Sequence, residues 1–356
     1  MRKMIFAAFL TVILLSGCKS DGVAVTDLPP EVLTGATVIE PETVYELPDT
    51  VYAGSAFVYK DRYAVCVMQS NDYSAEVYDL IEGKIVGRML HYGNGPQEVL
   101  FPKFALVGDT LQVHDLQKGK MYMVPCDGFP DAPIARQMDI GFTTVSIISC
   151  GDSLLSLNPY YFENDDMGIH NGEPLLFYTD GKKVPYDSSK PWSLNIVQGG
   201  LTRHPGNGRV VFADLNVSEV VFLDEDLVEF RRVTGPVHGS IDYVHVNGVL
   251  AYDGSGMGMN AYLSLCSDRA FIYLLYDGRR YAMNDDTVDW EYTDHDLYLF
   301  QMDWDGELLG SYVLKGVDYV MSELSCGAEP GTVYVSAVSP DEGNLEIFFY
   351  DLRKYN

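Results

Sequence analysis

Apolar and polar residues alternate at a period of two along most of the chain after residue 35. The apolar runs are five to eight residues long, and Asp, Gly, Asn and Pro separate them. This spacing is typical of half-buried strands joined by turns. Tyrosine, which suits sheet surfaces, occurs 25 times. The pattern therefore predicts an all-β chain with almost no helix.

One unit of strands recurs six times along the chain. Each unit has an apolar strand, a turn, and a second strand that ends in an aromatic residue near an Asp or Asp-Gly turn. The first strands are residues 63–68, 111–115, 154–157, 209–213, 270–275 and 332–338. The second strands end near Tyr78-Asp79, Tyr122, Phe177, Phe222, Phe300 and Tyr350-Asp351. Four strands in roughly 50 residues is the rhythm of a propeller blade.

We therefore predict a six-bladed β-propeller over residues 35–356. A β-sandwich is the rival fold, but it would not explain six units. The sixth unit has no room for a fourth strand, because only five residues follow Asp351. Residues 36–47 precede the first unit and have no other role. We predict that this N-terminal strand completes the last blade and closes the ring, which leaves no open edge between the first and last blades.

The start of the chain has the features of an export signal. Arg2 and Lys3 precede an apolar run over residues 5–15, which is too short for a membrane-spanning helix of roughly 20 residues. The run ends in Leu-Ser-Gly before Cys18, which resembles the bacterial lipobox. We predict a lipoprotein signal peptide over residues 1–17, lipidation of Cys18, and a lipidated tether over residues 18–34. The alternative is an ordinary signal peptide in which Cys18 is incidental.

The net charge of −27 narrows the classes of partner. Without Arg2 and Lys3 the chain has 22 basic and 51 acidic residues, and no basic cluster offsets the acidic excess. Such a chain repels nucleic acid, so we expect no nucleic-acid partner. The alternative is that the acidic excess serves only to keep the protein soluble.

Six cysteines leave five after lipidation of Cys18, and no Cys-x-x-Cys pair occurs. Four of them lie in apolar, strand-like runs: Cys66, Cys150, Cys266 and Cys326. They are typical of small buried hydrophobic residues, and a disulfide framework is not expected at this length. The pattern is still compatible with one incidental disulfide bridge between two of these cysteines.

A short phrase after the first unit resembles a known family. The phrase is His-Tyr-Gly-Asn-Gly-Pro-Gln-Glu at residues 91–98, and Gly93, Gly95, Pro96 and Glu98 match a Gly-x-Gly-Pro-x-Glu motif in order. In the TolB-like six-bladed β-propeller lipoprotein family of Bacteroidetes this motif follows the first blade. The resemblance covers residues 35–356. It implies the fold and a cell-envelope location, with the outer membrane expected and the periplasmic or surface face left open, but little chemistry.

The longest insertions predict where a ligand binds. In a blade with strands a to d, the b–c loops and the d–a connections emerge at the same end of the ring. The insertions at residues 158–174 and 277–296 are b–c loops by this assignment, and the motif phrase is a d–a connection. Long loops on a rigid scaffold often carry function. The candidate ligand-binding residues are Tyr160, Tyr161, Asp165, Asp166, His170, Trp290, Tyr292, Asp294 and His295. Their rings could equally pack against their own loops.

The leading hypothesis is a non-catalytic binding module that holds a glycan, a peptide or an envelope protein, anchored to the membrane through Cys18. The alternative is a hydrolase or lyase with carboxylate and histidine chemistry near the central channel. His91, His114, His170, His204 and His295 are candidates, but no pair can be defended, so no catalytic residue is assigned. A third hypothesis is a scaffold within an envelope complex. No cofactor or metal site is predicted, since residues 303–307 only echo a calcium loop and fit a strand turn better.

Overall fold

The computed structural model describes residues 22–48, 53–68, 72–140, 142–144, 146–150, 153–157, 160–161, 176–178, 198–239, 243–246, 249–252, 257–284, 287–290, 296–317, 322–339 and 343–355. The regular secondary structure in these ranges is strand, except for helix α1 (Glu31–Thr34) and two 3-10 turns at Cys126–Gly128 and Leu352–Lys354; turns and irregular connections join the strands. The all-β prediction is confirmed. None of the described helices has the length and apolar character that crossing a membrane requires. The predicted signal peptide and Cys18 lie outside these ranges.

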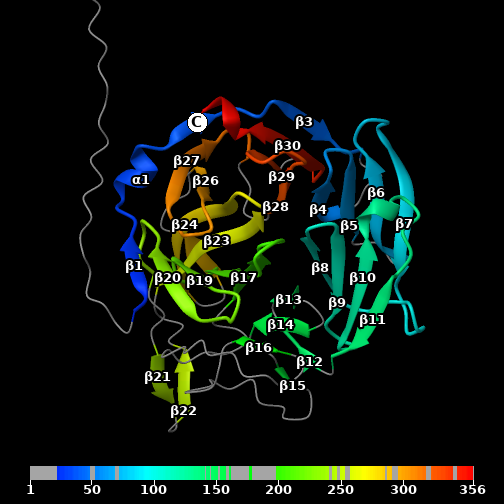
Figure 1. Cartoon of the computed structure of the whole chain (residues 1–356), viewed down its shortest axis with the longest axis horizontal. Helices are drawn as coiled ribbons and strands as arrows, with labels where there is room; N and C mark the ends of the chain where they lie inside the picture. The colour runs from blue at the N-terminus through cyan, green and yellow to red at the C-terminus, as the bar shows by residue number, and fades with distance from the viewer. Residues whose placement is uncertain are drawn as a thin grey trace, which may run out of the picture.

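Antiparallel sheets stand around a common axis and form a β-propeller (Figure 1). Five sheets have at least four strands. The first contains β4 (Ala53–Tyr59), β5 (Tyr63–Met68), β6 (Tyr73–Asp79) and β7 (Lys84–His91), and the second contains β8 (Pro102–Val107), β9 (Thr110–Asp115), β10 (Lys120–Pro125) and β11 (Arg136–Asp139).

The remaining large sheets follow from the second half of the chain. The strands are β17 (Gly199–Arg203), β18 (Val210–Asp214), β19 (Glu219–Leu223) and β20 (Glu229–Thr234); β23 (Met257–Ser267), β24 (Ile272–Asn284), β26 (Leu297–Met302) and β27 (Leu308–Leu314); and β28 (Ser322–Cys326), β29 (Thr332–Val338) and β30 (Leu345–Asp351). Each sheet pairs its strands in chain order, as the predicted units require.

The third predicted unit is a three-stranded sheet in the described part of the chain. It contains β13 (Ser146–Cys150), β14 (Ser153–Leu157) and β16 (Leu176–Tyr178). It packs on the second sheet, because Ile147 and Leu154 share a hydrophobic cluster with Met121. Five complete sheets and one of three strands confirm the propeller, while six full blades stay a prediction.

The N-terminal segment runs along the outer edges of three successive sheets. Strand β3 (Thr43–Glu46) pairs antiparallel with β30 and supplies the fourth strand of the last sheet, so the predicted ring closure is confirmed. Strand β2 (Thr37–Ile39) instead pairs in parallel with β27 of the preceding sheet. The single closing strand expected over residues 36–47 is therefore divided between two sheets.

Residues 24–34 also belong with the ring, although the sequence suggested a tether. Strand β1 (Ala24–Asp27) pairs in parallel with β20, and the amide of Leu28 donates to the carbonyl of Thr234 at 2.8 Å. Leu28 is buried, and Val32 and Leu33 pack against the same cluster. Burial of these apolar side chains explains why the segment is held against the sheet.

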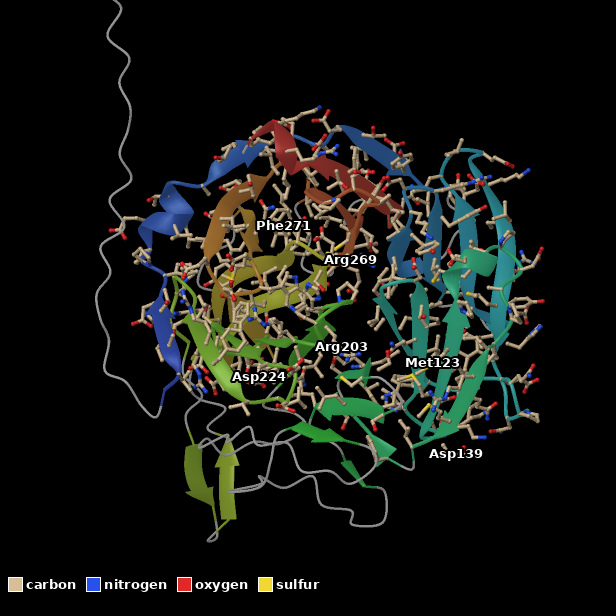
Figure 2. The ribbon with its side chains drawn as sticks, in the orientation of Figure 1. Met123, Asp139, Arg203, Asp224, Arg269 and Phe271 are labelled. Carbon is tan, nitrogen blue, oxygen red and sulfur yellow. The ribbon has the colours of Figure 1, made fainter. Side chains whose placement is uncertain are left out.

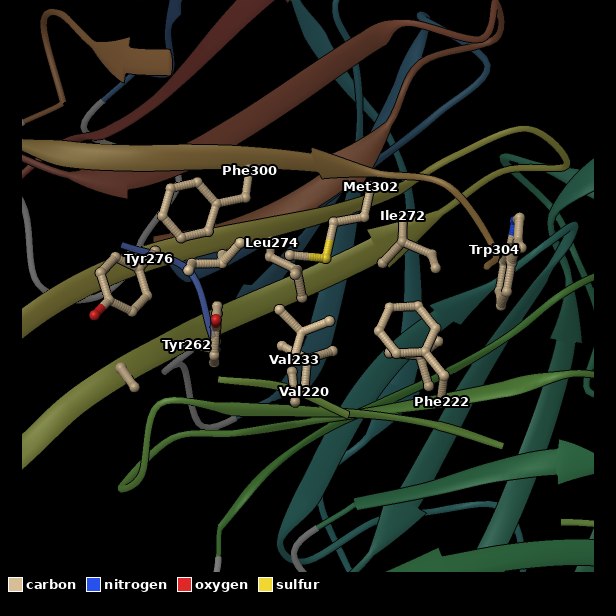
Figure 3. Close-up of a cluster of buried hydrophobic side chains, with 14 of the residues drawn as sticks. Val220, Phe222, Val233, Tyr262, Ile272, Leu274, Tyr276, Phe300, Met302 and Trp304 are labelled. Carbon is tan, nitrogen blue, oxygen red and sulfur yellow. The ribbon is translucent and has the colours of Figure 1, made fainter. Parts of the chain in front are cut away.

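The core consists of apolar layers between neighbouring sheets. Figure 3 shows the layer between the sheets of β17–β20 and β23–β27, where Phe222 and Val233 face Ile272, Leu274 and Phe300. Middle strands are covered on both faces, which is why β18 (Val-Val-Phe-Ala-Asp) is buried at every position. The polar residue that ends such a strand starts the turn. Asp79 Oδ1, for example, accepts hydrogen bonds from the amides of Ile81 and Glu82.

Candidate functional site

Three successive units add strands at the same end of the ring. After β14, strand β15 (Tyr160–Tyr161) pairs with β12 (Phe142–Thr143). After β20, strands β21 (Tyr243–Val246) and β22 (Val249–Tyr252) form a hairpin. Strand β24 continues to Asn284 and pairs with β25 (Thr287–Trp290). The ends of second and fourth strands lie at one end of an up-and-down sheet, so these additions share that end with the motif phrase.

The structure describes part of the predicted ligand-binding set. Tyr160 and Tyr161 form β15, and Trp290 ends β25 opposite Tyr281. The segment from residue 277, predicted as a loop, is instead largely paired strand, because β24 extends past the sheet to Asn284. The other candidates lie outside the described residues: Asp165, Asp166, His170, Tyr292, Asp294 and His295.

The motif phrase forms a compact loop, which we call the motif loop (residues 93–98), between β7 and β8. Glu98 Oε2 accepts a hydrogen bond from the amide of Gly95 at 2.6 Å. A Cβ at Gly93 would overlap that same oxygen, and one at Gly95 would lie 2.8 Å from Glu98 Cδ. The two glycines and the carboxylate of the motif therefore fit one another, which gives the motif a structural role.

Neighbouring strands hold the motif loop in place. Lys118 Nζ donates to the carbonyls of Gly95 at 3.1 Å and Glu98 at 2.7 Å, and the hydroxyl of Tyr122 also donates to Glu98 O at 3.1 Å. The amide of Gly93 donates to the carbonyl of Val99 at 2.9 Å. Burial raises the pKa of Tyr122, which keeps the hydroxyl protonated as a donor. The loop is thus a rigid wall between the first two sheets.

A pocket of about 560 Å³ lies beside the motif loop. We call it the β7 pocket. One side is the end of β7, and the opposite side carries apolar side chains of the second sheet. Its lining residues are Arg88, Met89, Leu90, His91, Gly95, Pro96, Gln97, Glu98, Val124, Ala132 and Ile134. The volume lies in the range of roughly 300–1,000 Å³ that is usual for small-ligand sites.

The polar rim of the β7 pocket is fixed by contacts within the first sheet. Arg88 Nε donates to Glu76 Oε1 at 2.8 Å, and its guanidinium lies over the ring of Tyr73. The imidazole of His91 packs on the same ring, with centroids 4.0 Å apart. Leu90 adopts φ +54°, so the strand bends at this point. The pocket therefore combines an apolar wall with oriented polar groups.

A second polar group lies on the inner strands of the ring. Strands β4, β8, β13, β17, β23 and β28 are the inner edges of their sheets, and successive strands from β8 through β13, β17, β23 and β28 to β4 contact one another. Glu323 on β28 accepts a hydrogen bond from Ser264 Oγ at 3.0 Å. Loss of hydration raises the pKa of Glu323 to about 7, while Ser264 and Lys103 act in the opposite direction. Desolvation likewise lowers the pKa of Lys103 on β8.

Other side chains near the channel are also charged. Arg203, at the end of β17, lies at the inner edge of the ring (Figure 2), and within the described part of the chain its buried Nε has no hydrogen-bond partner. Sequence reasoning did not select Lys103, Arg203 or Glu323. In an alternating strand each resembles an ordinary solvent-facing residue, and only the ring brings the inner strands together.

The histidines proposed for catalysis have separate structural roles where they are described. His91 packs on Tyr73, as above. His114 is buried, and desolvation lowers its pKa to about 4. His204 Nδ1 accepts from the amides of Gly206 and Asn207, and its ring packs against Trp304. His170 and His295 lie outside the described residues.

No metal-binding arrangement is seen in the ranges that the structure describes, where no three His, Cys, Asp or Glu side chains converge. The calcium-like sequence at residues 303–307 forms a turn. Asp303 Oδ1 accepts from the amides of Asp305 and Glu307, both at 2.9 Å.

Comparison with solved structures gives the fold without an activity. A Bacteroides fragilis protein named "Putative exported protein" aligns with a TM-score of 0.54 and 9% identity, over 92% of this chain and 99% of that chain. A DUF4221 family member from Bacteroides vulgatus aligns with a TM-score of 0.54 and 11% identity, over 87% and 97%. No protein-family model and no curated protein sequence matches the chain.

Proposed function

We propose that this chain is a non-catalytic binding module of the cell envelope, and that the β7 pocket seats its ligand. The observation that carries the proposal is the β7 pocket itself: an apolar wall and fixed polar groups on a rigid frame, at the end of the ring where the added strands lie. Strands β15 and β25 would give a second contact region at that end for a larger partner.

The outer edges of the sheets indicate the class of ligand. The chain places its own strands β1, β2 and β3 on the outer edges of β20, β27 and β30. Strand β7 is the equivalent outer edge of the first sheet, and among the described residues it pairs only with β6. An extended peptide that pairs with residues 84–89 could place a side chain in the pocket, the mode of β-strand addition.

The location is proposed on two grounds. Residues 1–18 have the features of a lipoprotein signal with lipidation at Cys18, and the Bacteroides fragilis neighbour is named as exported. A lipid anchor there would hold the ring at the outer membrane, as in the TolB-like lipoproteins that the motif resembles. We also propose the three-stranded sheet as the third of six blades.

Binding of peptides tests the proposal. The mature protein without lipid would be titrated with labelled ten-residue peptides of alternating apolar and polar residues, and with oligosaccharides, using fluorescence anisotropy. We expect a peptide to bind, and Ala132→Trp, which fills the pocket, to weaken that binding at least tenfold. Ile81→Ala is the matched control, because Ile81 is apolar and 74% exposed in the β6–β7 turn at the other end of the ring.

Three outcomes would count against this assignment. If only oligosaccharides bind, and Trp290→Ala but not Ala132→Trp weakens them, the ligand lies on the added strands and is a glycan. If neither class binds, the pocket is not a ligand site and the scaffold hypothesis gains. Unchanged binding in Ala132→Trp would also contradict the siting.

The channel favours an enzyme as the second candidate function. A carboxyl group with a pKa of about 7 at Glu323 could serve as a general acid in a hydrolase or lyase. This hypothesis predicts turnover of a chromogenic glycoside or ester panel that Glu323→Gln abolishes. Activity that survives Glu323→Gln would exclude Glu323 as the catalytic acid.

A further inference from the structure

Two cysteines from different sheets meet on the inner strands of the ring. Cys266 lies near the end of β23, and Cys326 ends β28. Their Sγ atoms are 3.0 Å apart, although 60 residues separate them in the chain. This separation is shorter than two unbonded sulfur atoms normally keep, and about 1 Å longer than a disulfide bond. The ring therefore brings two thiols nearly to bonding distance.

The surroundings of the two sulfurs are ordered. Both side chains are partly buried and pack against the hydrophobic cluster between the sheet of β23–β27 and the sheet of β28–β30. The turn after Cys266 is fixed by Asp268, whose Oδ1 accepts from the amides of Ala270 and Phe271. After Cys326, the amide of Gly327 donates to the carbonyl of Thr332 at 2.8 Å. These hydrogen bonds hold the backbone that follows each cysteine.

We propose that Cys266 and Cys326 form a disulfide that joins β23 and β28, the inner strands of two neighbouring sheets. The thiols lose two protons and two electrons, one S–S bond forms, and an external disulfide oxidant is cleaved to two thiols. The location of the reaction rests on the proposed export, since an oxidising compartment supplies such oxidants. The bond itself does not depend on any ligand.

Cys66 and Cys126 differ from this pair in their exposure. Cys66 and Cys126 are fully buried, and desolvation raises the pKa of each thiol, to about 12 for Cys126. Because full burial keeps an oxidant away from their sulfur atoms, whereas Cys266 and Cys326 are partly exposed, they should resist oxidation in the folded protein. Burial also raises the pKa of Cys266, so we expect the bridge to form faster as the pH rises.

Peptide mapping tests the bridge directly. The mature chain, purified in reductant, would be exchanged into oxidised glutathione at pH 8, unfolded, and alkylated with N-ethylmaleimide. We expect a peptide containing Cys266 to be linked to one containing Cys326, while Cys66 and Cys126 carry the alkyl group. Oxidation should also raise the melting temperature by about 5 °C, since the bridge closes a long loop.

The variants separate a specific bridge from general thiol oxidation. Cys150→Ser should keep both the linked peptide and the rise in melting temperature, whereas Cys326→Ser should lose both. Alkylation of Cys266 and Cys326 after full exposure to oxidant would overturn the proposal, as would a link from either one to Cys150. Should Cys326→Ser fail to fold, the mapping of the wild-type protein decides alone.

Discussion

The carboxylate of Glu98 shows how one side chain can determine a loop. It lies against Gly93 and Gly95 and accepts from the amide of Gly95, so it cannot move aside without losing that hydrogen bond. Gly93 also has φ +155°, which L residues rarely adopt. Both features explain why the motif requires glycine at these positions.

A double-mutant cycle tests this coupling. We expect Gly93→Ala to lower the free energy of unfolding by about 2 kcal/mol and Glu98→Ala by about 1 kcal/mol. The double variant should lose less than the sum, because removing the carboxylate relieves the overlap. Urea unfolding measures all three. Gly108→Ala, where a Cβ meets nothing within 4 Å, should be additive with Glu98→Ala; additivity at Gly93 as well would contradict the account.

The pKa of Glu323 predicts a dependence of stability on pH. Its pKa is raised from 4.5 to about 7 in the folded state. The protonated form is therefore favoured by folding, and the stability that it contributes is present below pH 4.5 and is lost as the pH rises through 7. Glu323→Gln should raise the free energy of unfolding at pH 8 by roughly 2 kcal/mol and leave it almost unchanged at pH 4.5.

Urea unfolding at the two pH values measures this difference. Glu329→Gln is the control, because Glu329 is exposed in the turn after β28. The free energy of unfolding of this variant should depend on pH in the same way as that of the wild-type protein. A variant Glu323→Gln with the same pH profile as the wild type would refute the burial of this carboxyl group.

Sequence patterns located turn residues well and channel residues poorly. Asp79 and Asp351 end their strands as predicted, and Asp303 directly follows β26 at a predicted turn, because an Asp side chain accepts hydrogen bonds from amides a few positions ahead. Glu323 was not found, since its partners Ser264 and Lys103 come from other sheets. Interactions within a few residues can be read from the chain, whereas contacts across the ring cannot.

At the scale of elements, the N-terminal segment joins three sheets. Successive side chains of β2 point to opposite sides of the strand. Ile39 is therefore fully buried in the layer between the sheet of β23–β27 and the sheet of β28–β30, while Val38 is 55% exposed. Ile39→Ala should lower the free energy of unfolding by about 3 kcal/mol, and Val38→Ala by less than about 0.5 kcal/mol. Thermal or urea unfolding checks both. Equal effects would show that β2 does not pack as described.

The strands found from sequence share one property: they belong to a unit whose partners are close in the chain. Residues 63–68 and 332–338 match β5 and β29 at both ends. Strand β1 was assigned to a tether, because four residues with mostly outward side chains carry no pattern and the partner β20 is some 200 residues away. The hairpin of β24 and β25 was missed for a different reason, since polar residues there concealed the pairing.

For the whole molecule, the ring explains both rigidity and site. Apolar layers join neighbouring sheets, the N-terminal segment completes the last one, and added strands extend from one end of the ring. The acidic charge of the chain keeps anionic polymers away. The ligand is therefore expected at an edge or connection of the ring, and the described geometry favours β7.

Hydrogen–deuterium exchange with saturating peptide tests this claim most directly. Added strand pairing should slow exchange at the alternate amides of residues 84–89 that point away from β6, and at the motif loop, with little change in the β6–β7 turn around Ile81. Protection at β15 and β25 alone, or no protection anywhere, would contradict binding at the β7 pocket.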